Sequence, residues 1–125
     1  MNSFPHLLAA ALLLSNLTIR AQDDPIDISK YATGELRIPI ALSGYDGEVA
    51  SVLKYDLEIV GFQIVAESAS HQHVVKGSNA GRVEGRLIDT ISKAQLLGVA
   101  FSNGSPRAQA HALADAVIEK LTGRK

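Results

Sequence analysis

The stretch Ile38–Glu67 most constrains the fold, because its pattern indicates a strand, a helix and a second strand in succession. Alternating apolar residues typical of a short strand come first, at Ile38, Ile40 and Leu42. Over Asp46–Val60 the apolar residues then recur at spacings of three and four, which places them on one face of an α-helix. Gly61 suits the end of that helix, and Phe62–Glu67 alternates again as a strand does. The unit predicts a sheet with a helix packed on it.

Three further strands are expected after this unit. His73–Gly77 has the apolar pair of a short strand, and Arg82–Ile91 alternates apolar with charged residues. Ser92–Ala94 turns the chain and Gln95–Phe101 returns it. Since the last two runs are close together with nothing helical between them, they should form an antiparallel hairpin.

The clearest helical signals lie over Ser105–Thr122. Ser105 is a favourable N-cap, Pro106 suits the first helical position, and Gly123 suits the left-handed residue that ends a helix. We therefore expect an α/β (α+β) fold, with a mixed sheet of four or five strands and two helices packed on one face. The buried residues should include Leu53, Leu57, Val117 and Leu121.

Composition excludes several classes of function. A chain of 125 residues is long enough for one domain with its own core. The net charge of −1 gives no electrostatic argument for nucleic acid or an anionic membrane, and without tryptophan a stacking surface for bases or sugars is not expected. The absence of cysteine excludes thiol catalysis, zinc held by cysteine, and the lipid attachment of a bacterial lipoprotein.

Residues Met1–Ala21 have the character of a secretory signal peptide. Leu7–Leu14 is apolar but far shorter than the ~20 residues of a membrane-spanning helix, and Ile19–Ala21 ends on a small residue as a cleavage site does. The segment before Leu7 holds no lysine or arginine, so an uncleaved apolar N-terminus is the alternative. The expected product begins near Gln22, lies in the periplasm and is not stably inserted in a membrane.

The next segment, Gln22–Thr33, is expected to be an extended arm ahead of a domain over 34–125. Ile26 and Ile28 lie on the same side of an extended chain, and Pro25 would block regular pairing at one point. The segment has too little apolar surface to fold alone, but it could add as a strand to a partner's sheet. A leader without fixed structure is the alternative.

Five titratable residues were considered for chemistry. His71 and His73 are two residues apart and could form a metal pair, but no third ligand is near, so a solvated loop is the preferred interpretation. His111 is interpreted as a histidine at the boundary of the core, because no nucleophile is evidently paired with it. Asp56 and Asp115 could be surface or capping carboxylates, with a general acid–base pair as a third option. No cofactor or metal site is expected.

Two glycine-containing motifs have simpler interpretations than ligand binding. The turn Gly44–Gly47 lies between a strand and a helix, as anion-binding turns do, but it lacks both the G-x-G-x-x-G pattern and a Walker lysine. Asn103–Ser105 matches a glycosylation acceptor and is better explained as a turn followed by an N-cap.

Several of these segments resemble the N-terminal domain of the TolB family. The last helix, His111–Gly123, has the histidine, the aspartate and the Leu-Thr-Gly end found there. Asp56–Glu58 with the following Gly61 and Phe62 resembles the family's first helix, while Val74–Gly77 and Arg86–Asp89 correspond to a V-x-G strand and an L-x-D strand. The resemblance covers about residues 26–123 and leaves out the β-propeller that follows this domain in the family.

The resemblance implies a non-enzymatic adaptor of the periplasmic Tol–Pal system, which serves envelope maintenance or translocation. In that family the N-terminal arm binds the inner-membrane partner TolA. The residues that would bind a TolA-like partner here are Asp24, Pro25, Ile26, Asp27, Ile28 and Ser29. The linker Ser68–Gln72 is shorter than the helix that the family usually places there. Two alternatives stay open: an assembly factor domain of the outer-membrane or peptidoglycan-synthesis lipoprotein-activator type, and a small periplasmic enzyme that uses His111 and Asp115.

Overall fold

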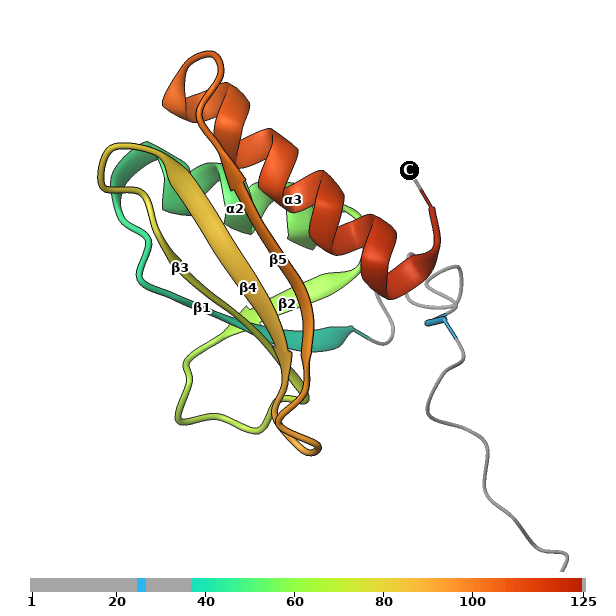
Figure 1. The fold of residues 1–125 in the computed structure, drawn as a ribbon. Helices are drawn as coiled ribbons and strands as arrows, with labels where there is room; N and C mark the ends of the chain where they lie inside the picture. Colours follow the sequence, from blue (N-terminus) through green and yellow to red (C-terminus); the bar gives the residue numbers. More distant parts are fainter. Residues whose placement is uncertain (1–24, 27–36, 125) are drawn as a thin grey trace, which may run out of the picture.

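A computed structural model of the chain describes residues 25–26 and 37–124, and these form one mixed sheet with two helices on one face (Figure 1). The elements in chain order are β1 (Ile38–Ser43), α2 (Gly47–Ile59), β2 (Phe62–Val65), β3 (His73–Ser78), β4 (Val83–Asp89), β5 (Gln95–Phe101) and α3 (Pro106–Thr122). The strand order is β2-β1-β3-β4-β5. β1 pairs in parallel with β2 and β3, whereas β3, β4 and β5 pair antiparallel. The expected α+β fold and its hairpin are confirmed.

Both helices begin and end within a residue of the predicted bounds, because local signals fix their ends. The Ser105 hydroxyl accepts a hydrogen bond from the amide of Ala108 at 3.1 Å, as an N-cap does. Gly123 adopts the left-handed conformation, with φ of +75°, and closes α3. At α2 the flanking residues Asp46 and Val60 lie just outside the helix.

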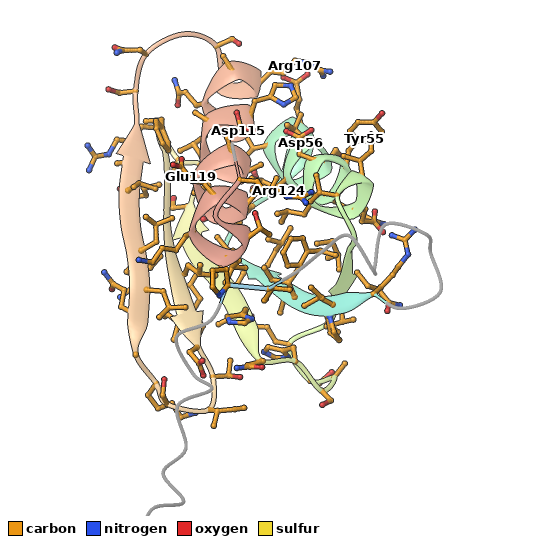
Figure 2. The ribbon with its side chains drawn as sticks, turned by 90° about the vertical axis from the view of Figure 1, so that its right-hand side faces the viewer. Tyr55, Asp56, Arg107, Asp115, Glu119 and Arg124 are labelled. Carbon is orange, nitrogen blue, oxygen red and sulfur yellow. The ribbon has the colours of Figure 1, made fainter. Side chains whose placement is uncertain are left out.

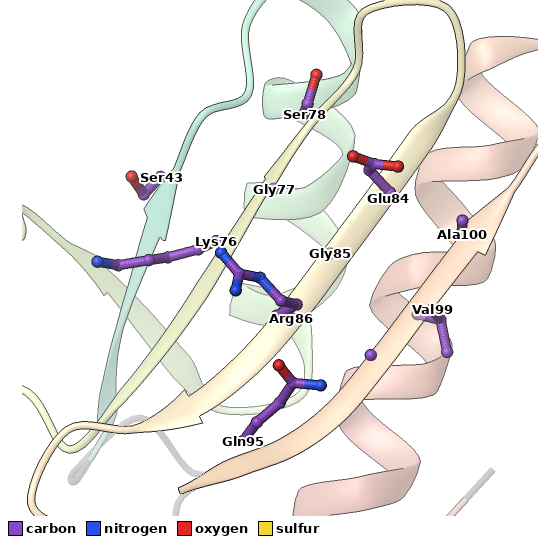
Figure 3. Close-up of a pocket in the computed structure, with 11 residues that line it drawn as sticks. Ser43, Lys76, Gly77, Ser78, Glu84, Gly85, Arg86, Gln95, Val99 and Ala100 are labelled. Atoms are coloured by element: carbon purple, nitrogen blue, oxygen red, sulfur yellow. The ribbon is translucent and has the colours of Figure 1, made fainter. Parts of the chain in front are cut away.

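The core lies between the helices and the sheet. All four residues expected to be buried are buried, and Leu57 is fully so. The helices contribute more residues to the core cluster than the sheet does, and its largest members are Phe62, Ile40, Leu53, Leu57, Leu87 and Leu113. Side chains on the other face of the sheet are not covered by a helix (Figures 1 and 3).

The connection between β2 and β3 is short although both strands run parallel to β1. Such crossovers usually need a dozen or more residues. Here β2 ends at Val65 beside Ala41, and β3 begins at His73 beside Ile40. Along the direction of the strands, β3 starts close to the point where β2 ends. The connection therefore has only to cross β1 and does not have to run back along the length of a strand. A polar linker of this length therefore suffices.

Tyr45, in the turn between β1 and α2, lies over a pair of facing glycines. Gly77 on β3 and Gly85 on β4 are register partners, and a Cβ at either position would come within 2.5 Å of the Tyr45 hydroxyl. That hydroxyl donates a hydrogen bond to the carbonyl of Glu84 at 2.7 Å. Burial, and secondarily the charge of Glu84, raises the pKa of Tyr45, so the hydroxyl keeps the proton that it donates.

We predict that Gly85→Ala and Tyr45→Phe destabilise the protein non-additively. The added Cβ would meet both the Tyr45 hydroxyl and Leu113, at a cost of roughly 1–3 kcal/mol. Tyr45→Phe should cost about 1 kcal/mol for the lost hydrogen bond. Since removing the hydroxyl also makes room for the Cβ, the double variant should lose less than the sum. Denaturant unfolding measures all three free energies.

Gly98→Ala is the matched control for this cycle. Gly98 lies on the uncovered face of β5, where an added Cβ would meet only the flexible end of Gln95. Its unfolding free energy should stay within about 0.5 kcal/mol of the wild type. Strict additivity of Gly85→Ala and Tyr45→Phe would contradict the contact.

Candidate functional site

The most polar contact between the two helices is a histidine–carboxylate pair. Nδ1 of His111, on α3, lies 2.5 Å from Oδ2 of Asp56, on α2. The Asp56 side chain is 16% exposed and that of His111 is 43% exposed. Figure 2 shows Asp56 between the helices, with Tyr55 and Arg107 on either side of it. Both residues were candidates in the sequence analysis, but the sequence did not predict that they contact each other.

The pair borders an open groove of about 530 Å³ between α2 and the start of α3. A second, longer ion pair crosses the same groove, from Arg107 to Glu48 at 4.0 Å. Tyr55, 65% exposed, forms part of its wall. The Ser51 hydroxyl in this groove donates to the carbonyl of Gly47 at 3.3 Å, one turn back along α2. Two side-chain pairs in the groove thus join the helices, and an aromatic side chain beside them is open to solvent.

No hydrogen bond or ion pair joins His111 to Asp115 in the described part of the chain. Asp115 is exposed on α3 and, within residues 37–124, makes no hydrogen bond or ion pair. The carboxylate that orients the His111 ring is Asp56 instead. Because a carboxylate can only accept, Nδ1 of His111 carries the shared proton and Nε2 is the nitrogen that could act on a ligand.

Two residues of the expected binding arm are among those that the structure describes. The amide of Ile26 donates to the carbonyl of Leu121 at 3.0 Å, and the Ile26 side chain packs against the core. The last carbonyls of a helix have no partner within it, and Ile26 satisfies one of them. Pro25 is exposed. The other expected binding residues, Asp24, Asp27, Ile28 and Ser29, lie outside the described residues, as does the expected signal peptide Met1–Ala21.

The turn Gly44–Gly47 is closed by a side chain from another loop. Asn79, after β3, accepts a hydrogen bond from the Asp46 amide at 3.0 Å and donates to the Asp46 carboxylate at 2.9 Å. The helix N-terminus that an anion could approach therefore already faces a carboxylate, and its first free amide is engaged. Asn103–Ser105 forms the turn and N-cap that the sequence predicted.

The interpretation of His73 as part of a solvated loop is wrong. His73 begins β3 and is 6% exposed, because its register partner Ile40 is a core residue. Its Nδ1 has no hydrogen-bond partner among the described residues. His71 does lie in the loop before β3. No group of three or more histidine, aspartate or glutamate side chains that could hold a metal occurs in the described part of the chain.

Burial and a neighbouring carboxylate act in opposite directions on His73. Desolvation lowers the pKa of His73 below its ordinary value of 6.5, and the charge of Asp89 opposes this more weakly. The pKa of Asp89 is itself lowered, mainly by the hydrogen bond from the Ser92 amide. His73 is therefore a neutral core residue that becomes costly when protonated.

One curated protein shares sequence with this chain. The alignment with the Tol-Pal system protein TolB of Bordetella avium (strain 197N) extends over 130 residues at 32% identity and covers 78% of this chain. Over most of its length, the chain is similar to a region of TolB. It spans only 29% of the length of that relative. No family model and no solved structure matches the chain. Among the helices of the described residues, none is long and apolar enough to cross a membrane.

We predict that Asp56 and His111 are energetically coupled. Their short, partly buried contact should give a coupling of about 1 kcal/mol in a double-alanine cycle of unfolding free energies. The Glu48–Arg107 pair is the matched control, because it joins the same helices at 4.0 Å with both side chains about 60% exposed. Its coupling should be no more than about 0.5 kcal/mol. Equal coupling in the two cycles would show that the Asp56–His111 contact does not tie the helices together.

We predict that His73 makes the fold less stable in mild acid. A histidine whose pKa is lowered by folding binds protons more readily in the unfolded state. The free energy of unfolding should therefore be unaffected by His73 above pH 6.5 and should decrease as the pH falls below that value. His73→Leu and His73→Gln should both weaken this decline, measured by urea unfolding between pH 7 and pH 5. His73→Gln should be the less stable of the two, because it keeps a buried polar group. An unchanged pH slope in both variants would rule His73 out as the cause.

Proposed function

We propose that this chain acts in the bacterial envelope as a Tol–Pal-type adaptor that works through protein contacts in the periplasm and catalyses no reaction. The observation that carries the proposal is the similarity to TolB, which extends over 78% of the chain. The Asp56–His111 pair is consistent with an adaptor, because both groups are used to join α2 to α3. The hydroxyl of Ser51 in the same groove donates its hydrogen bond to the helix backbone.

The proposed partner is a TolA-like protein, and the proposed binding element is the arm around Asp24–Ser29. Ile26 supplies a fixed point at the end of α3, through its hydrogen bond to Leu121. Residues on either side of this point include Asp24, Asp27 and Ile28. An extended segment of this kind binds by adding a strand to a partner's sheet, with the main chain giving affinity and alternate side chains giving register.

We expect Ile28→Asp to weaken binding of the TolA-like protein from the same bacterium by about tenfold or more. Ile28 is chosen over Ile26 because Ile26 also contributes to the core, so that its replacement would confuse binding with stability. Placing a carboxylate where an apolar side chain enters the partner's sheet leaves that charge without water or a counter-ion. Isothermal titration calorimetry measures the affinity.

The matched control is Ile91→Asp. Ile91 lies in the turn between β4 and β5 and is 76% exposed, so the same chemical change there should leave both folding and binding unaltered. Equal affinity of the Ile28→Asp variant and the wild type would show that the arm is not the binding element. Absence of binding by the wild type would reject the TolA-like partner itself.

A further inference from the structure

The uncovered face of the sheet carries a hollow that no function assigned above uses. It has a volume of about 520 Å³ and lies over β3, β4 and β5 (Figure 3). The polar side chains that line it include Ser43, Ser78, Lys76, Arg86, Glu84 and Gln95. Both helices of the described residues lie on the other side of the sheet from this hollow (Figure 3).

Two cations stand side by side in this hollow. Lys76 on β3 and Arg86 on β4 are register partners, and both line the hollow on the same face. Like charges directly opposite each other on neighbouring strands destabilise a sheet. Neither makes an ion pair with another described residue, and the nearby Glu84 carboxylate is already paired with Arg82 at 3.2 Å. The arrangement costs stability unless a negatively charged group lies between the two.

The adjoining strand β5 has the character of an edge that accepts another strand. It lies at the margin of the sheet order and, within the described residues, hydrogen-bonds along its main chain only to β4 (Figure 2). Its sequence, QLLGVAF, has no charge and no proline. Sheet edges are usually protected by lysine, proline, a bulge or a short length. β5 has seven residues without lysine or proline, and its register irregularity is confined to its start, opposite Leu87 and Ile88.

The hollow and the edge are continuous, because β5 has small residues on the uncovered face. Gly98 faces Arg86 across the sheet and Ala100 faces Glu84. Neighbouring strands are about 4.8 Å apart, so a strand added outside β5 would lie roughly 10 Å from β4. Figure 3 shows the Arg86 side chain directed toward β3, and a turn of this exposed side chain toward β5 would let it meet a glutamate of the added strand across Gly98.

We propose that β5 binds an extended acidic segment of a partner protein as an added strand, that Arg86 holds a carboxylate of that segment, and that Lys76, one strand farther away, adds positive charge to the same face. The main chain of Gln95–Phe101 pairs with the segment, and the two cations select for acidic side chains on its uncovered face. The proposal does not depend on the arm or on the TolA-like partner.

The test uses a short blocked peptide in which threonine alternates with glutamate, and the same peptide with glutamine in place of glutamate. Fluorescence anisotropy of the labelled peptide should show that the purified protein binds the glutamate peptide more tightly. Arg86→Gln should weaken that binding about tenfold or more, as expected for loss of a charge-assisted hydrogen bond. Lys76→Gln should weaken it less, because Lys76 lies one strand farther from the added segment. The arm variant Ile28→Asp should bind like the wild type.

Lys54→Gln is the control for long-range charge, because Lys54 is exposed on α2 in the helical layer. It should bind the glutamate peptide like the wild type. The melting temperature of Arg86→Gln should be unchanged or higher, since the substitution removes a like-charge contact, and this separates a binding role from a structural one.

Amide hydrogen exchange distinguishes strand addition from simple anion binding. Saturation with the glutamate peptide should slow the exchange of the outward-facing amides of β5. Equal binding of the two peptides, unchanged exchange in β5 on saturation, or no binding at all would each overturn the proposal.

Discussion

The packing of Tyr45 against the facing glycines Gly77 and Gly85 is the contact on which the arrangement of the layers depends. A side chain at either glycine would push the tyrosine ring off the sheet and, with it, the turn that starts α2. Leu113 of α3 lies over the same glycine of β4, so α3 and the turn before α2 both meet the sheet at this point. The tyrosine hydroxyl also satisfies a carbonyl on β4. One side chain therefore fixes the height of the helical layer above the hairpin.

Features encoded by residues close together in the chain could be predicted from the sequence. The N-cap at Ser105, the first-turn proline and the left-handed Gly123 each act within one turn, so the bounds of α3 follow from them. The strands and the antiparallel hairpin follow from alternation and short turns. The number of strands and the placing of both helices on one face agreed with the expected class, because amphipathic elements have few ways to bury their apolar faces.

Features that depend on distant residues could not be predicted in this way. Asp56 and His111 were each considered, but they lie on different helices, and only the crossing of those helices brings them together. His73 was interpreted as part of a solvated loop because no third metal ligand lies near it in the sequence, whereas its register against Ile40 places it in the core. The facing of Lys76 and Arg86 likewise depends on strand register, which single-residue patterns do not specify.

The hydrogen bond between Ile26 and Leu121 joins positions separated by almost the whole length of the described chain. Contacts of such long sequence separation carry the largest loop-closure entropy and form after local structure. Since chains are synthesised from the N-terminus, Ile26 emerges long before the helix that receives it. Until α3 has formed, the segment around Ile26 has no docking place on its own domain. The order of folding thus gives a time window in which chaperones or a partner can reach this segment without competition from α3.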